Sequence, residues 1–231
     1  MRAADLRIGG FAPFSTIDQP GKLVATVFTR GCPWRCGYCH NPHLMAIDGS
    51  EETDFTWNQI ADHLSRRKGL LDAVVFSGGE PTVQSALWAA MTEVLDMGFS
   101  VGMHTNGAYP RRINALLPYL SWVGLDIKAP FDEYDKVTGV ESSGELARQS
   151  LALLAGSDID FEVRTTIDLR SFDTETLTRL APHIEEAAPE RWAIQRRRID
   201  GVEVQTGQLA PLDEAALHGL LGGFDVEVVL R

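Results

Sequence analysis

The segment Cys32-Pro-Trp-Arg-Cys36-Gly-Tyr-Cys39 contains all three cysteines of the 231-residue chain. Its spacing is C-x3-C-x2-C, and no fourth cysteine exists to complete the set. Closed electron-transfer clusters are held by four thiolates, and structural zinc sites by four ligands. Three thiolates can hold three irons of a four-iron cluster and leave the fourth iron open. The segment therefore predicts an iron site at which chemistry takes place.

Two other uses of three clustered cysteines compete with this interpretation. His40 could complete a Cys3His zinc set, but it adjoins Cys39, and neighbouring residues rarely converge on one tetrahedral ion. The sequence has no second Cys-x-x-Cys pair of the kind that completes an ordinary zinc module. A disulfide framework is disfavoured, because the cysteine count is odd and the chain is long for a small secreted scaffold. The open iron cluster is the favoured interpretation.

Short apolar runs rich in β-branched residues alternate with helical patterns along the rest of the chain. Several are nearly continuous hydrophobic runs, which is typical of parallel strands buried on both faces. Strands that alternate with helical patterns indicate βαβ units with right-handed crossovers. The predicted strands are Leu23–Thr29, Ala73–Ser77, Phe99–His104, Trp122–Ile127, Asp160–Ile167, Trp192–Gln195 and Asp225–Leu230.

Helical patterns fill the gaps between these strands. Thr56 with Gln59, and Ser142 with Glu145, have the spacing of a capping box at a helix start. Pro182 is expected to kink or end the helix in which it lies. The other predicted helices cover Val83–Met97, the segment that Asp173 opens, and the segment between Pro211 and Gly222.

Chemically active residues follow the predicted strands at their carboxyl ends. The cysteine segment follows the first strand, Ser77-Gly-Gly-Glu-Pro81 the second and His104-Thr-Asn-Gly107 the third. Asp126-Ile-Lys128 ends the fourth, Arg164 lies in the fifth and Gln195 ends the sixth. Parallel α/β folds bind their ligands at the carboxyl ends of the strands. We therefore expect these residues to form one site.

The cysteine spacing, followed by Ser77-Gly-Gly-Glu-Pro81, resembles the radical S-adenosylmethionine (radical SAM) enzymes. In that family three cysteines ligate a [4Fe–4S] cluster, and its open iron binds S-adenosylmethionine. An electron from the cluster cleaves the cofactor to methionine and a 5′-deoxyadenosyl radical. The resemblance implies Cys32, Cys36 and Cys39 as cluster ligands, and a [4Fe–4S] cluster and S-adenosylmethionine as cofactors.

The resemblance also implies the fold and its organisation. Six βαβ units are too few for a closed eight-stranded barrel. The radical SAM enzymes use a partial (β/α)6 barrel, so the expected fold class is α/β of that form. Residues 1–231 are expected to form one domain, in which 1–22 is an N-terminal extension.

Cofactor contacts can be carried over from the family motifs. The Gly-Gly-Glu-Pro motif meets the amino group of S-adenosylmethionine, with Glu80 supplying charge nearby, and Tyr38 flanks the adenine. We expect a bulky side chain at Gly79 to impair cofactor binding and spare the cluster. By themselves, paired glycines indicate only a turn. The full predicted set is Tyr38, His40, Gly78, Gly79, Glu80, Asn106, Asp126, Lys128, Arg164 and Gln195, with no catalytic side chain beyond cluster and cofactor.

Four of these contacts, Asp126, Lys128, Arg164 and Gln195, come from the fourth to sixth predicted strands. Asp126 and Lys128 match a D-x-K element of glycyl-radical-enzyme activases, although alone they could be a surface salt bridge. Arg164 resembles a family arginine near the methionyl carboxylate, and its fork geometry suits bidentate carboxylate binding. Relatives carry aspartate in place of His104 and histidine in place of Gln195. A neutral histidine cannot replace a carboxylate as a hard-cation ligand, so a monovalent cation site is in doubt.

Within the family, the resemblance points to activating proteins of glycyl radical enzymes, in particular of anaerobic ribonucleoside-triphosphate reductase. It is carried by Leu6–Gly10, Phe14–Lys22 and Gly31–Pro42 and by the later motifs. It implies that a 5′-deoxyadenosyl radical abstracts hydrogen from a glycine of a large partner enzyme. A flavodoxin- or ferredoxin-type protein would supply the electron.

Other functions stay open at this point. Within enzymes they are pyruvate formate-lyase activation or a small-molecule radical SAM reaction, as in relatives of 7-carboxy-7-deazaguanine synthase. Outside enzymes, the chain could be an iron–sulfur or zinc-binding module. The net charge of −11 argues against nucleic acid as partner. No apolar run approaches the roughly 20 residues of a membrane span, and reduced thiols favour the cytoplasm.

Overall fold

The centre of the fold is an eight-stranded sheet in the order β1-β2-β3-β4-β5-β6-β7-β10. The computed structural model describes residues 1–47, 55–167, 174–196, 198–199, 202–203, 219, 222 and 226–230. The strands of this sheet are β1 (Ile8–Ser15), β2 (Val24–Thr29), β3 (Ala73–Gly78), β4 (Ser100–Thr105), β5 (Trp122–Asp126), β6 (Asp160–Ile167), β7 (Arg191–Arg196) and β10 (Val228–Leu230). β1 pairs antiparallel with β2, and every other pair is parallel.

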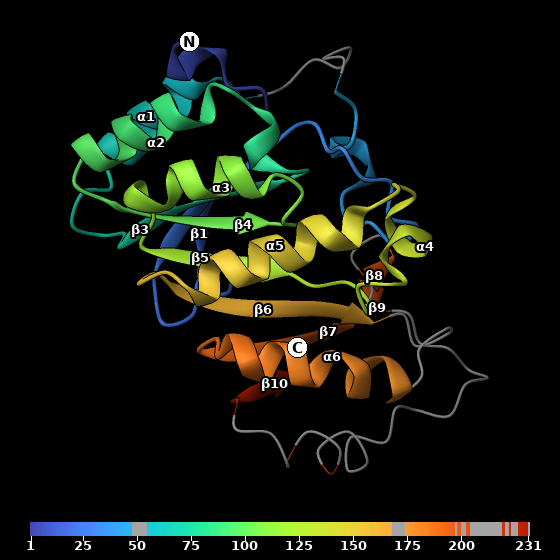
Figure 1. Cartoon of the computed structure of the whole chain (residues 1–231). Coiled ribbons are helices and arrows are strands. Elements are labelled where there is room, and N and C mark those ends of the chain that lie inside the picture. Colours follow the sequence, from blue (N-terminus) through green and yellow to red (C-terminus); the bar gives the residue numbers. More distant parts are fainter. Residues whose placement is uncertain are drawn as a thin grey trace.

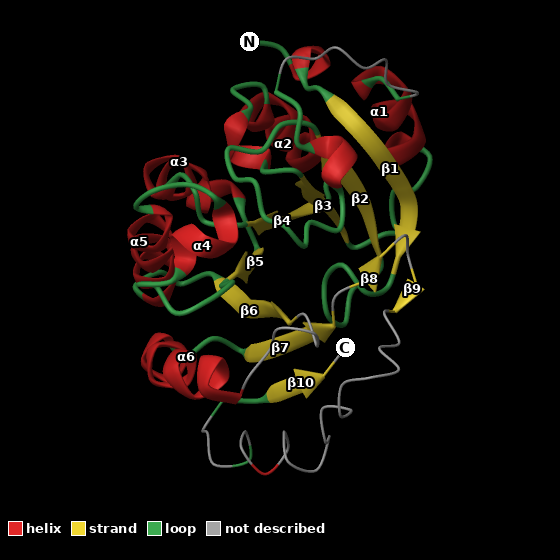
Figure 2. Cartoon of the chain, turned by 90° about the vertical axis from the view of Figure 1, so that its right-hand side faces the viewer, coloured by secondary structure: helices red, strands yellow, loops and turns green. Residues whose placement is uncertain are grey.

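The predicted partial barrel is confirmed. Figure 2 shows the strands in an arc with the helices along its outer side. β1 and β10 lie at the two ends of this arc, and within the described residues they do not pair with each other. A separate two-stranded sheet is formed by β8 (Arg198–Ile199) and β9 (Val202–Glu203). The open sheet is what six βαβ units predict.

All seven predicted strands are present, and the first six agree with the structure to within one residue at either end. The last prediction, Asp225–Leu230, is too long, because β10 begins at Val228. The parallel strands are easy to predict because both faces are covered. Strand residues such as Val74, Phe76 and Val123 have no exposed surface.

The N-terminal segment 1–22 contains a strand that the sequence analysis does not predict. β1 joins the sheet as its edge strand, with Gly10 opposite Phe28. The chain then turns into the barrel, where the Asp18 carboxylate accepts a hydrogen bond from Thr26 Oγ1 at 2.7 Å. The extension is therefore part of the barrel wall and of its interior. That 1–231 form a single domain stays a prediction.

The helices are α1 (Trp57–Ser65), α2 (Leu87–Asp96), α3 (Pro110–Leu116), α4 (Tyr134–Thr138), α5 (Ser143–Ala155) and α6 (Thr174–Ala187). Short 3-10 turns lie at η1 (Ala3–Asp5), η2 (Pro42–Leu44), η3 (Pro81–Val83) and η4 (Leu117–Tyr119). α3 and α4 are not predicted from the sequence. The helix predicted between Pro211 and Gly222 lies mostly outside the described residues. Among the described helices, none has the length and apolar character that a membrane span needs.

Three predictions about helix ends have different outcomes. The capping box of Thr56 with Gln59 is confirmed, whereas that of Ser142 with Glu145 is wrong. Ser142 has φ +62° and caps nothing. Instead, the Asp135 carboxylate accepts the backbone N–H groups of Ser142 and Ser143, at 3.1 and 3.2 Å. α6 runs through Pro182, which lies on its exposed face.

The helix predicted over Val83–Met97 begins later than expected. Its first residues form the 3-10 turn η3, and α2 starts only at Leu87. The Arg112 guanidinium binds the carbonyl oxygens of Thr82 and Val83, at 2.6 and 2.9 Å. This interaction satisfies two carbonyl groups that a longer helix would have bonded internally.

Candidate functional site

A cavity of about 250 Å³ lies at the carboxyl ends of the parallel strands. In Figure 1 the arrowheads of β4 and β6 point to this side of the molecule, where α4 also lies. Every predicted site residue except Glu80 lines the cavity. These residues are Cys32, Cys36, Tyr38, Cys39, His40, Gly78, Gly79, Asn106, Asp126, Lys128, Arg164 and Gln195. The expectation that the strand-end motifs form one site agrees with this arrangement.

The cysteine loop after β2 is held by backbone hydrogen bonds on both sides. Gly31 N donates to Leu44 O at 2.8 Å and Cys32 N to Met45 O at 3.2 Å, so the two ends of the loop pair with each other. The Arg35 side chain donates to Cys32 O at 2.6 Å, inside the loop. These bonds fix the backbone that carries the three thiols.

The environment of the thiols fits a cluster that is held by three cysteines. Burial raises the pKa of the Cys32 thiol to about 12 and also raises the pKa of Cys36. Iron binding opposes this shift, because a ligating thiol is deprotonated. Within the described part of the chain, no three cysteine, histidine or acidic side chains gather tightly enough to hold a single metal ion. The three thiols instead face one shared cavity.

The paired glycines at the end of β3 are required by the protein's own backbone. Gly78 has φ +113°, a conformation that favours glycine. A Cβ on Gly79 would lie within 3.0 Å of the carbonyl oxygens of Gly31 and Leu44. A side chain at Gly79 would push against the backbone of the cysteine loop, so we now expect it to disturb the cluster as well as the cofactor.

Glu80 does not line the cavity, although its charge acts on Cys32, and its predicted role as a nearby charge stays a prediction. Its side chain is fully buried and accepts hydrogen bonds from Thr82, Thr105 and the backbone N–H of Asn106. Burial raises the pKa of Glu80, and these donors oppose that shift. The carboxyl group thus ties the turn after β3 to the end of β4.

A network of three charged side chains forms one wall of the cavity. Asp126 Oδ1 accepts hydrogen bonds from Arg164, and Asp126 Oδ2 lies 3.2 Å from Lys128 Nζ. Burial alone would raise the pKa of Asp126, but Arg164 and Lys128 outweigh it and hold this pKa well below its usual range. Burial would lower the pKa of Lys128, but Asp126 outweighs it and raises this pKa. All three groups are therefore charged, with a net charge of one positive unit.

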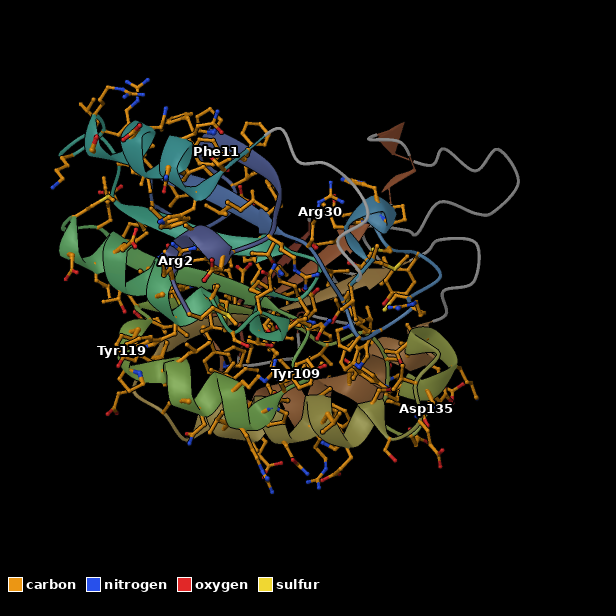
Figure 3. The ribbon with its side chains drawn as sticks, turned by 90° about the horizontal axis from the view of Figure 1, so that it is seen from above. Arg2, Phe11, Arg30, Tyr109, Tyr119 and Asp135 are labelled. Carbon is orange, nitrogen blue, oxygen red and sulfur yellow. The ribbon has the colours of Figure 1, made fainter. Side chains whose placement is uncertain are left out.

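Helix α4 connects this charged wall to the cysteine loop. The Tyr134 hydroxyl donates to Asp126 O and accepts from Lys128 N, at 3.1 and 3.0 Å. The Tyr134 ring meets the indole of Trp34 edge to face, with centroids 5.6 Å apart. Thr138 O, at the end of the helix, accepts the backbone N–H of Arg35 at 2.7 Å. Figure 3 shows Asp135 of the same helix at the periphery of the molecule.

His104 and Asp18 form the inner part of the cavity. His104 Nε2 lies 2.6 Å from the carbonyl oxygen of Asp18, so this nitrogen is the donor, and Nδ1 accepts from Ser77 Oγ at 3.1 Å. Burial, followed by the charge of Arg164, lowers the pKa of His104 to about 3. The ring is neutral and both its nitrogens are engaged. Asp18 is missed by the sequence analysis, which does not single it out.

Comparison with known proteins places the chain in a family. Residues 26–185, more than half of the chain, match the model of the radical SAM superfamily. A protein of Methanocaldococcus jannaschii named as a glycyl-radical enzyme activating enzyme is 30% identical over 196 residues, covering 82% of this chain and 79% of that protein. The pyruvate formate-lyase-activating enzyme of Clostridium pasteurianum is 31% identical over 144 residues, covering 60% of this chain and 59% of that enzyme.

Solved structures support the fold. The crystal structure of QueE from Escherichia coli has a TM-score of 0.59 and 16% identity, covering 98% of this chain and 93% of that one. At this identity the likeness concerns the fold alone. The chain belongs to the radical SAM superfamily. Its members use a [4Fe–4S] cluster and S-adenosylmethionine in oxidoreductase chemistry, and the three cavity-lining cysteines fit that cluster.

Proposed function

We propose that this protein is an activating enzyme for a glycyl radical enzyme. The observation that carries the proposal is the shared cavity, in which three cysteines face the Asp126, Lys128 and Arg164 network. The names of the relatives from Methanocaldococcus jannaschii and Clostridium pasteurianum support the same class of reaction. Cys32, Cys36 and Cys39 hold the cluster in this proposal.

When bound, the cluster supplies the electron for reductive cleavage of S-adenosylmethionine. The remaining work falls to the side chains of the cavity. After pairing with Asp126, Arg164 and Lys128 give this wall of the cavity a net charge of one positive unit. A positive wall suits the carboxylate of the cofactor. Lys128 Nζ also lies 5.9 Å from the Tyr38 ring centroid, over the ring that flanks the adenine in this proposal.

Further proposed contacts come from the backbone and from the far side of the cavity. Gly78 and Gly79 present backbone to the amino group of the cofactor, while Asn106, His40 and Gln195 border the same space. Glu80 acts indirectly, by fixing the turn that carries Asn106. The partner's glycine loop would close the cavity and exclude water.

The proposed partner is an anaerobic ribonucleoside-triphosphate reductase, with a flavodoxin- or ferredoxin-type reductant in the cytoplasm. Support comes from the motifs at Leu6–Gly10, Phe14–Lys22 and Gly31–Pro42. The neutral His104 supports the same partner, because relatives of the pyruvate formate-lyase activating enzyme carry aspartate at this position. Pyruvate formate-lyase is the competing partner, because the Clostridium pasteurianum relative is named for it.

Electron paramagnetic resonance with both candidate partners tests this proposal. Reduced protein and S-adenosylmethionine are mixed with each partner, and a glycyl doublet is expected on the reductase. A doublet on pyruvate formate-lyase alone would reassign the partner and keep the reaction class. Deoxyadenosine without a doublet on either partner would favour a small-molecule substrate and contradict the activase.

A further inference from the structure

Asn106 lies between a buried carboxylate and the sulfur of a cysteine. Its side-chain nitrogen Nδ2 donates a hydrogen bond to Cys32 Sγ at 3.5 Å. Its Oδ1 accepts the backbone N–H of Ala108 at 3.0 Å. An amide has one accepting and one donating end, and only oxygen can accept from Ala108. The NH2 group is therefore the end that faces the sulfur.

Glu80 fixes the position of Asn106 through hydrogen bonds to the turn that carries it. The backbone N–H of Asn106 donates to Glu80 Oε2 at 2.7 Å. Thr105 Oγ1 donates to the same carboxylate and accepts the backbone N–H of Gly107 at 3.1 Å, which closes the turn after β4. Glu80 has no exposed surface and takes part in no contact with the cavity. It acts on the site through the residues it holds and through its negative charge, which contributes to raising the pKa of Cys32.

We propose that Asn106 sets the reduction potential of the cluster and that Glu80 is the positioning residue that holds Asn106 in place. This inference rests on the proposed function, in which Cys32 is a cluster ligand. Hydrogen bonds to ligand sulfurs are among the main determinants of cluster potential. The positive end of the N–H dipole points at Cys32 Sγ, so it stabilises the more negative, reduced cluster. Asn106 therefore raises the potential and makes the cluster easier to reduce.

A potentiometric titration of the anaerobically reconstituted protein, followed by electron paramagnetic resonance, tests the inference. Asn106→Ala removes the donor, and a hydrogen bond to a charged group changes an equilibrium by about tenfold. For a one-electron couple this is a shift of about 59 mV toward more negative potential. Asn106→Asp keeps the acceptor for Ala108 but turns an anionic oxygen toward the sulfur, so it should shift further. Glu80→Gln also removes a negative charge that acts on Cys32, and this loss alone raises the potential. We therefore compare Glu80→Gln in the wild type and in Asn106→Ala, since the difference isolates the part that acts through Asn106, and this part should be a shift toward more negative potential.

Asn58→Asp is the matched control, because it makes the same chemical change on the exposed surface of α1. Its potential should equal that of the wild type. Wild-type potentials in Asn106→Ala and Asn106→Asp, measured on samples with full iron content, would overturn the inference and leave the proposed function intact. A wild-type protein that takes up no iron would overturn both.

Discussion

Arg164 binds a single carboxylate oxygen of Asp126 twice, through Nε at 2.9 Å and through Nη2 at 2.8 Å. The two residues are direct neighbours on adjacent parallel strands, β5 and β6. Lys128 binds the second oxygen of Asp126. Both oxygens of this carboxylate are thus used to hold cations in place, which leaves the remaining N–H groups of Arg164 and Lys128 for an anionic ligand.

Replacing Asp126 should therefore destabilise the fold as well as the site. Asp126→Asn leaves two neighbouring buried cations without their counter-charge, and we expect a loss of about 3 kcal/mol in the free energy of unfolding. Anaerobic urea unfolding measures it. Glu145→Gln is the control, since it breaks the exposed ion pair with Arg148 and should cost less than about 1 kcal/mol. Equal losses in the two variants would contradict the buried network.

Tyr134→Phe tests the connection between α4 and the charged wall. The phenyl ring keeps the contact with Trp34, but Asp126 O and Lys128 N lose their common partner. Leaving buried polar groups unsatisfied should cost about 1–3 kcal/mol in urea unfolding. Tyr119→Phe, at a half-buried ring that packs on Trp88, should change stability by less than about 0.5 kcal/mol. The account is contradicted if the two variants behave alike.

Gly79→Ala should reduce iron incorporation, because its Cβ would press on the backbone of the cysteine loop. Gly37→Ala is the matched control. Gly37 lies between Cys36 and Tyr38 in that loop, and a Cβ there would meet no atom within 4 Å. Iron per chain after anaerobic reconstitution is the measurement. Full iron in Gly79→Ala together with weak S-adenosylmethionine binding would contradict this prediction and support a role of Gly79 in leaving space for the cofactor.

His104 should make stability depend on pH. Burial and Arg164 lower its pKa to about 3, against the opposing effect of Asp18 and Asp126. The unfolded chain, with a histidine pKa of 6.5, therefore binds a proton first as the pH falls. Stability is full above that pH and is lost as the pH falls from 6.5 toward 3.

The wild type should lose about 1.4 kcal/mol more than His104→Gln between roughly pH 7.5 and 5.5. Urea unfolding of both proteins at the two pH values measures this difference. Parallel losses in the two proteins would show that His104 is not the responsible group.

Prediction from sequence succeeds where a pattern is local and repeated. The parallel strands are buried on both faces, so their hydrophobic runs are visible without knowledge of their neighbours. The positions of the strand ends can be predicted from these runs. Most of the residues that line the cavity lie at those ends. β1 is missed because Gly9, Gly10 and Pro13 are poor strand formers, and contacts with other elements, such as its pairing with β2, stabilise it.

The errors come from contacts that the local sequence motif does not contain. Ser142 has the spacing of a capping residue, but Asp135 takes that role from the preceding helix. Gly79 resembles a ligand-binding glycine, and only the fold shows that Gly31 and Leu44 occupy the space beside it. Glu80 belongs to a recognisable motif, and nothing in the motif indicates that the carboxylate is fully buried and does not line the cavity.

The central claim is that three cysteines hold a cluster that cleaves S-adenosylmethionine. The most direct test measures iron and 5′-deoxyadenosine on one sample of reconstituted, dithionite-reduced protein with S-adenosylmethionine. We predict about four irons per chain together with deoxyadenosine, and neither a full cluster nor product in Cys36→Ala. Stoichiometric zinc without iron, or a full cluster that forms no deoxyadenosine, would contradict the account.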